Sequence, residues 1–305
     1  SGSDSRTKVA RRGFDPGEEV ISADPVRDRA ASGGSWSTRT VASILLGSGH
    51  AVPSTSLPGL AGPSIARSMT LPALYARWMK AFLEVDLPEE AEATCASCPL
   101  LPDPEAIYPS PRSFEPTTKC CTYIPNLPNF LVGSILSSDD PAMAEGVDSV
   151  RTRIEAGEGV SPLGIDRSLE KDLLYERLGS LGFGREPRLR CPHYRASDGG
   201  CGIWLHRNAI CSTWFCKHSR GRRGQRLWMI VKTLLSVLER ELSLWVVGEV
   251  GADVRRLEHL LFPDLSTPAG PMGGDGARGA GSASDLWGDW AGREEDFYIE
   301  CGRRV

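Results

Sequence analysis

The chain has 305 residues, 40% of them hydrophobic and 24% charged, and a formal net charge of −4. This length is enough for one large domain or two ordinary ones with a buried core, and the composition excludes a chain that is disordered throughout. The slightly acidic balance argues against a protein that coats DNA, although it is compatible with a local basic patch.

The N-terminal part of the chain shows little regular patterning. Residues 1–66 are rich in serine, glycine, proline and arginine, so we expect an irregular arm there. The first helical pattern begins at Leu71 and stops before Pro88. Many prolines then mark 87–118 as an extended loop.

The middle of the chain alternates between apolar and polar segments. Residues 131–136 are apolar enough for one or two helical turns, whereas 137–162 are polar and predicted to be an exposed connection. Asp166 can cap the next helix, which glycines from Gly179 onward would end. The predicted apolar stripe of this helix consists of Leu169, Leu173, Leu174 and Leu178.

The longest helix is predicted over 225–247, and a further helix over 253–261. The wide apolar face of the longest helix consists of Leu227, Ile230, Val231, Leu234, Leu235, Leu238, Leu242 and Trp245. Residues 266–284 are rich in glycine, alanine and serine, which is typical of a flexible linker. The tail carries four aromatic residues that we expect to dock on the body, namely Trp287, Trp290, Phe297 and Tyr298.

These patterns predict a mainly α fold with long irregular loops and a cysteine-rich metal-binding core. The expected parts are the arm 1–66, a helical cysteine-cluster domain over 67–265, and a linker with its docking tail over 266–305. No run of about 18 apolar residues occurs, so we predict no membrane span and no membrane partner. We expect a cytoplasmic protein, and in that compartment clustered cysteines are more often metal ligands than disulfides.

Nine cysteines, an odd number, cannot all pair within the chain. Eight of them form two groups by spacing. The first group is Cys95, Cys98, Cys120 and Cys121, and the second is Cys191, Cys201, Cys211 and Cys216. Four thiolates close a tetrahedral zinc site or hold a four-iron cluster, so we predict that all eight are metal ligands.

Two other interpretations of the cysteines stay open. Free cysteine is among the most buried residue types, and this is the interpretation we favour for the isolated Cys301. Disulfides would be expected mainly in an exported protein. Zinc and iron are harder to separate, because only Cys95 and Cys98 form a Cys-x-x-Cys pair and no ferredoxin-type run is present.

The segment from Gly200 to Cys216 carries a specific resemblance. It is similar to the hallmark of the YkgJ-type family of zinc- or iron-chelating cysteine-cluster proteins, which reads roughly Cys-x-Ile-Tyr-x-x-Arg-Pro-x-x-Cys-Arg. Asn208 stands where the family has Pro, and Ser212 where it has Arg.

The family also has an upstream Cys-x-x-Cys and a Cys-Cys pair. Cys95, Cys98 and Cys120-Cys121 resemble these in the same order, with 21 residues inserted between the two motifs. Some members hold iron–sulfur clusters, and a flagellin lysine methylase carries a domain of this type. The resemblance therefore implies a [4Fe-4S] cluster, with zinc as the alternative cofactor.

We expect one cluster on Cys201, Cys211 and Cys216 together with Cys120 or Cys121, while Cys95, Cys98 and Cys191 complete it or form a second site. The cluster would be a redox, sensing or catalytic centre. The alternatives are a zinc-stapled interaction module without catalysis and a cluster-dependent group-transfer enzyme such as a protein methylase. The partner would be a small molecule or a protein.

Charged residues next to the cysteines suggest two secondary roles. We expect the nearby histidines to support the site rather than to ligate the metal; they are His193, His206 and His218. A basic run after Cys216, including Arg220–Arg226, could bind an anionic ligand or be a solvated helix start. No aromatic interleaving accompanies this run, so a nucleic-acid partner is not expected.

Overall fold

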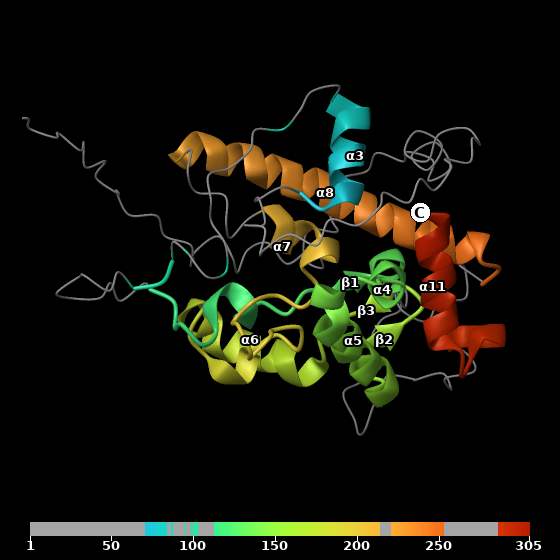
Figure 1. Ribbon diagram of the computed structural model, residues 1–305, viewed down its shortest axis with the longest axis horizontal. Coiled ribbons are helices and arrows are strands. Elements are labelled where there is room, and N and C mark those ends of the chain that lie inside the picture. Colours follow the sequence, from blue (N-terminus) through green and yellow to red (C-terminus); the bar gives the residue numbers. More distant parts are fainter. Residues whose placement is uncertain are drawn as a thin grey trace, which may run out of the picture.

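The structure is a computed structural model that describes residues 71–83, 87, 95, 98, 100–102, 113–213, 221–252 and 286–305. Helices dominate these residues and one small sheet accompanies them, which confirms the predicted mainly α class (Figure 1). The predicted arm 1–66, the helix over 253–261 and the linker 266–284 lie outside the described residues. No helix in the described part of the chain is long and apolar enough to cross a bilayer.

The short helix α4 (Asn129–Leu136) is the centre of the core. All its residues except Ser134 are buried, because α5 (Ala144–Ala156), α8 (Gly221–Glu249) and α11 (Glu294–Arg304) pack around it. A helix that is apolar on every side needs such enclosure. The prediction of one or two turns at this place is confirmed.

A three-stranded antiparallel sheet lies beside α4. Its strands are β1 (Leu127–Pro128), β2 (Val160–Ser161) and β3 (Gly164–Ile165), with β3 in the middle. Gly164 has a φ of 141°, and a Cβ there would lie 2.0 Å from the carbonyl oxygen of Leu127. Only glycine therefore allows the two strands to approach so closely.

The prediction that 137–162 form an exposed connection is wrong. The segment folds into the 3-10 turn η3 (Pro141–Met143), α5 and β2. Met143, Val147 and Val150 are buried, and their spacing of four and three residues places them on one side of the turn and helix. This apolar face is narrow, and the polar residues between its members conceal it in the sequence.

The helix α6 (Leu169–Gly182) differs in two ways from the predicted helix. Its N-cap is Ser168 rather than Asp166, and the expected buried stripe is wrong because Leu169 and Leu173 expose 63% and 56% of their surface. The helix runs past Gly179 to Gly182, although Gly179 interrupts its regular geometry with a φ of 52°.

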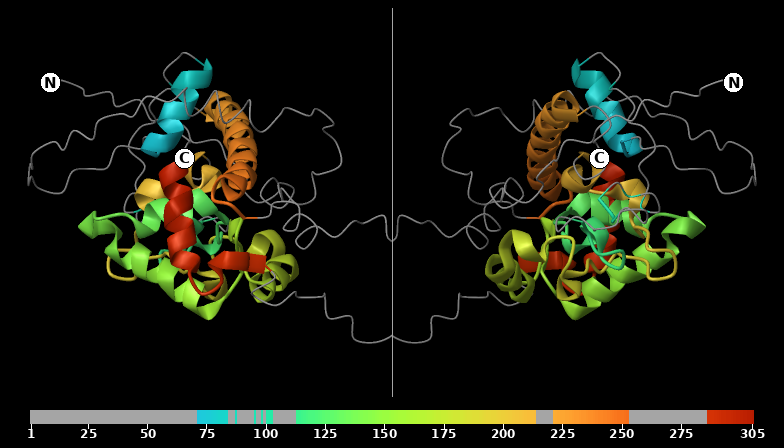
Figure 2. Two further views of the ribbon diagram at one scale, coloured as in Figure 1. Left: turned by 90° about the vertical axis from the view of Figure 1, so that its right-hand side faces the viewer. Right: turned by 90° about the vertical axis from the view of Figure 1, so that its left-hand side faces the viewer.

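The predicted long helix is α8, which extends from Gly221 to Glu249. Its inner face packs into the core, with the exception of Ile230, which is 68% exposed. The helix α3 (Ala73–Leu83) runs across the direction of α8 in Figure 1 and lies beside it in Figure 2. The two helices are joined by a hydrogen bond from the hydroxyl of Tyr75 to the carboxyl of Glu239.

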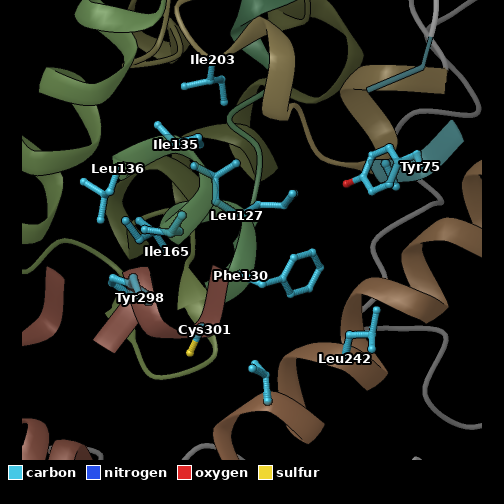
Figure 3. Packing of buried hydrophobic residues seen from close by; sticks show 14 of the residues in the cluster. Tyr75, Leu127, Phe130, Ile135, Leu136, Ile165, Ile203, Leu242, Tyr298 and Cys301 are labelled. Atoms are coloured by element: carbon cyan, nitrogen blue, oxygen red, sulfur yellow. The ribbon is translucent and has the colours of Figure 1, made fainter. Parts of the chain in front are cut away.

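The C-terminal segment belongs to the core. It contains the turn η6 (Gly288–Trp290) and α11, which lies against α4. Figure 3 shows Tyr298 and Cys301 of α11 facing the cluster of buried apolar side chains. The hydroxyl of Tyr298 donates to the carbonyl oxygens of Ser161, at 2.7 Å, and Gly164, at 3.0 Å. Cys301 is fully buried, in agreement with its predicted place in the core.

Candidate metal centre

Seven of the eight predicted ligands lie in the described part of the chain, and the structure gathers them. They are Cys95, Cys98, Cys120, Cys121, Cys191, Cys201 and Cys211. Cysteines of the two groups lie close enough to influence each other's pKa. The pKa of Cys121 is raised by burial and further by Cys201, Cys191 and Cys95. That of Cys211 is raised by burial and further by Cys201 and Cys120. Cys216, the eighth predicted ligand, lies outside the described residues.

The vicinal pair Cys120–Cys121 lies on the 3-10 turn η2 (Lys119–Thr122), which is anchored to Gly184. Thr118 Oγ1 donates to the Gly184 carbonyl at 2.8 Å, and the Gly184 N–H donates to Thr122 Oγ1 at 2.6 Å. Gly184 has a φ of +75°, and a Cβ there would lie 2.0 Å from the ring of Phe114. This glycine is therefore required for the position of the two thiols.

The loop that follows the turn η4 (Pro187–Leu189) brings two more cysteines to the same place. The N–H of Cys191 donates to the carbonyl of Cys121 at 2.6 Å, and Cys201 forms an isolated antiparallel bridge with Tyr194. Gly202 touches the first turn of α5, because a Cβ on Gly146 would lie 2.1 Å from the Gly202 carbonyl oxygen. The first turn of α5 thus packs against the loop that carries Cys201.

Cys211 lies on the short helix α7 (Ala209–Thr213), and the two departures from the family hallmark flank it. Asn208 Oδ1 accepts the Cys211 N–H at 3.0 Å, which is the role of a helix N-cap. Ser212 Oγ donates to the Arg207 carbonyl at 3.1 Å. Asn208 and Ser212 are both buried and hydrogen-bonded, so the local structure accommodates them.

The thiols are protonated near neutral pH. Withdrawal from water raises the pKa of Cys191 and Cys211 well above its usual value and that of Cys201 to about 11. A hydrogen bond to Cys121, together with burial, raises the pKa of Cys120. Because the thiolate is the nucleophile and the metal ligand, these cysteines are unreactive as free thiols.

The described residues do not form a complete metal site. All described cysteines are free thiols, and among the described Cys, His, Asp and Glu side chains no group of three is arranged to hold a metal ion. The structure therefore shows a gathering of thiols, and the predicted metal-binding core is not itself shown.

Three buried cations border the thiols, and composition gave no reason to expect them. Lys119, Arg153 and Arg207 expose only 7%, 6% and 4% of their surface. Among the described residues, none of the three has a carboxylate within 4 Å.

Each cation is associated with different cysteines. Burial raises the pKa of Cys98 and the charge of Lys119 opposes it, and Arg153 acts in the same way on Cys191. Lys119 has a φ of 51°, which is rare for a residue with a side chain, and its Nζ donates to the Gly199 carbonyl at 2.8 Å.

His193 is buried against α5. Its Nδ1 is 2.8 Å from the Oγ of Ser149, whose hydroxyl donates to the Gly146 carbonyl at 2.7 Å. Burial, aided by the charge of Arg153, lowers the pKa of His193 to about 3.

The other candidate residues are less informative. His206 ends the turn η5 (Trp204–His206), and burial lowers its pKa. His218 lies outside the described residues, as does the first part of the basic run, including Arg220. Arg222, Arg223 and Arg226 are exposed on the first turns of α8.

The comparisons with known proteins add no name to this site. No family model, no curated protein and no solved structure matches the chain. The resemblance of residues 200–216 to the cysteine-cluster hallmark therefore stays a prediction.

Proposed function

We propose that the chain is a metal–thiolate protein whose gathered cysteines hold a [4Fe-4S] cluster. The observation that carries this proposal is the convergence of seven thiols from segments more than 100 residues apart in sequence. Apolar packing alone does not explain it, because three buried cations lie beside the same thiols.

The raised pKa values argue against a thiol enzyme. Redox-active and nucleophilic cysteines work through a lowered pKa, whereas those of Cys191, Cys201 and Cys211 are raised. A metal removes this obstacle, since it displaces the thiol proton and the resulting thiolate is stabilised by the bond to the metal.

Cys120, Cys201 and Cys211 are the best candidates for the first ligands. Burial raises the pKa of Cys201 and Cys211, and the neighbouring Cys120 raises both further, as Cys201 does for Cys211. A cube of four irons needs a fourth cysteine, which would come from the remaining thiols. Such a cluster would supply electron transfer or a Lewis-acidic iron.

Anaerobic purification tests this proposal. We expect a brown protein with about four irons and four sulfides per chain, and a visible spectrum that bleaches on reduction. A colourless protein with stoichiometric zinc would replace the cluster by the zinc-stapled alternative. Protein that retains neither metal after reconstitution would overturn the proposal.

Two variants separate ligand loss from general damage. Cys211→Ser should lower the bound metal by at least half, because a hydroxyl is a poor substitute for a thiolate ligand. Cys301→Ser alters a cysteine in the apolar core of α11 and should lower stability with the metal content unchanged. Equal metal content in both variants would contradict the assignment of Cys211.

A further inference from the structure

The solvent face of α8 carries a row of exposed residues at the spacing of a coiled coil. Successive members are three or four residues apart in alternation, so they line up along one side of the helix. We call this row the outer seam; it consists of Arg223, Arg226, Ile230, Thr233, Val237 and Arg240. The opposite side of α8 packs into the core, and the beginning of the helix lies far from α4 and α11 in Figure 1.

Two β-branched apolar side chains lie in the middle of the outer seam. Ile230 is 68% exposed and Val237 is 46% exposed. They are seven residues apart, which is the same position of two successive heptads, with Thr233 between them. Single apolar residues scattered over a surface need no explanation, but this repeat is the pattern by which one helix packs against another.

The arginines at the beginning of α8 do not stabilise the helix. Arg222, Arg223 and Arg226 are exposed, and within the described part of the chain none of their side chains has an ion pair or a hydrogen bond. The first turn holds no acidic residue, although the positive end of the helix dipole favours acidic side chains and disfavours cations. Arg222 and Arg226 also repel each other at a spacing of four residues. An anionic partner would reverse both effects.

The acidic residues of α8 lie farther along the helix and are already engaged. The first is Glu239, which is 8% exposed and accepts hydrogen bonds from Tyr75 and Ala209 in the interior. The next, Glu241, is paired with Arg240. The outer seam therefore presents free cations at one end, apolar side chains in the middle and an ion pair at the other end.

We propose that the outer seam is a docking surface for an amphipathic helix of a partner protein, with acidic residues that face Arg223 and Arg226 and apolar residues that face Ile230 and Val237. Complementarity of charge and of apolar spacing identifies this occupant. The proposal does not depend on the metal centre, because the seam contains none of the cysteines.

Other occupants fit the outer seam less well. A second copy of this chain, paired antiparallel about Thr233, would place Arg226 opposite Arg240, and parallel pairing would place each arginine opposite itself, so like charges would meet. A nucleic-acid backbone gains nothing from contact with Ile230 and Val237, because its affinity comes from phosphate contacts. Helices that bind a lipid surface use tryptophan, phenylalanine and leucine, and the seam has none of these.

The test uses two fluorescent peptides of three heptads, each with leucine at positions a and d. One carries glutamate at positions e and g and its twin carries lysine there, and in both the like charges disfavour pairing of the peptide with itself. Anisotropy titrations with the full chain should show binding of the glutamate peptide and at least about tenfold weaker binding of the lysine twin. Binding of the glutamate peptide should weaken as salt is raised.

Variants locate the binding on the protein. Ile230→Ser and the double variant Arg223→Glu/Arg226→Glu should each weaken binding of the glutamate peptide about tenfold or more, the loss typical of a central interface contact. The matched controls lie on α6: Leu169→Ser, at a leucine that is 63% exposed, and Arg177→Glu, at an exposed arginine. Neither control should change the affinity. All these positions are exposed, so each variant should unfold at a temperature close to that of the wild type.

The proposal is wrong if the glutamate peptide does not bind, if both peptides bind equally, or if the seam variants and the α6 controls lose equal affinity. Vesicles of phosphatidylserine and a single-stranded oligonucleotide are titrated in parallel. Tighter binding to either one than to the glutamate peptide, lost in Arg223→Glu/Arg226→Glu, would assign the seam to lipid or nucleic acid instead. A wild-type dimer in sedimentation that Ile230→Ser dissociates would assign it to a second copy of the chain.

Discussion

Glu239 shows how one buried side chain connects three helices, α3, α7 and α8. It lies in the middle of α8, accepts the hydroxyl of Tyr75 from α3, and accepts the N–H of Ala209, the first residue of α7, at 2.7 Å. Burial raises its pKa to about 7, although both hydrogen bonds oppose the shift. Its charge state therefore changes near neutral pH, within electrostatic reach of Cys211.

The raised pKa makes stability depend on pH. Since the folded pKa of about 7 exceeds the ordinary value of 4.5, the folded state holds a proton that the unfolded state releases between these values. The contribution is fully present below about pH 4.5 and is lost as the pH rises through 7. At about 1.4 kcal/mol per pKa unit, the loss amounts to at most about 3–4 kcal/mol.

Glu239→Gln should abolish this dependence, because the amide oxygen still accepts both hydrogen bonds but does not titrate. We expect the variant to unfold at higher denaturant concentration than the wild type at pH 8, and at a similar one at pH 5. Chemical unfolding at the two pH values measures this. Glu249→Gln, at an exposed position of the same helix, is the control, and an unchanged pH profile in Glu239→Gln would contradict the prediction.

The roles of single residues were only partly predictable from the sequence. Spacing predicted that the eight clustered cysteines belong together, and isolation predicted that Cys301 is a core residue, because both are properties of the sequence itself. The burial of Lys119 and Arg153 was not predictable, since a basic residue in a loop is exposed far more often than it is enclosed.

At the scale of elements, the crossing of α4 and α11 depends on two glycines. A Cβ on Gly133 would lie 1.8 Å from the carbonyl oxygen of Tyr298, and one on Gly302 would lie 2.9 Å from the carbonyl carbon of Gly133. These contacts are with backbone, so no side-chain rotation can relieve them. The two helices therefore approach to backbone contact, which fixes how deeply Tyr298 and Cys301 enter the core.

Gly133→Ala should force α11 away from α4 and destabilise the fold by about 1–3 kcal/mol, the usual cost of overpacking. Thermal unfolding followed by circular dichroism measures the effect. Ser134→Ala, at the neighbouring position of α4, adds no atoms and serves as the control. If Gly133→Ala unfolds at the same temperature as the wild type, the close approach of α4 and α11 is incorrect.

Helices whose apolar residues recur over many turns were predictable from the sequence, and helices with a narrow apolar face were not. The pattern over 225–247 indicated α8 because its apolar residues recur over six turns. In α5 the buried face rests on few residues, of which Val147 and Val150 are examples, so polar neighbours dominate the segment. For α6 the error was the opposite one. Its leucines predicted a buried stripe, yet Leu169 and Leu173 are exposed, because periodicity alone does not reveal how much of a helix is covered.

At the scale of the whole molecule, the gathered thiols and the apolar core are neighbours that share supporting segments. The core joins α3, α4, α5, α8 and α11 through apolar side chains, and it also takes in Ile203 and Ala209, with Cys201 packed against it. The thiols themselves are carried by turns, by the loop after η4 and by the short α7. The sequence indicated that the cysteines belong together, but the positions of η2 and of the loop after η4 depend on tertiary contacts at Gly184 and Gly146, which no local pattern encodes.

If the thiols hold a metal as proposed, this arrangement predicts the effect of removing it. Stripping the metal should loosen the segments that carry the cysteines, because turns and loops have few backbone hydrogen bonds of their own and depend on their anchors. The helices α4 and α11 should keep their protection, since their contact is made by apolar side chains and glycines rather than by thiols.

Hydrogen–deuterium exchange of the loaded and stripped protein measures the effect at peptide resolution. We expect faster exchange in the peptides around 119–122 and 191–213, and unchanged exchange in α4 and α11. Cys211→Ser in the presence of metal should reproduce part of the stripped pattern around α7. Loss of protection in α4 and of most helical circular dichroism on stripping would instead show that the metal holds the whole fold together, as in a small zinc-stapled domain.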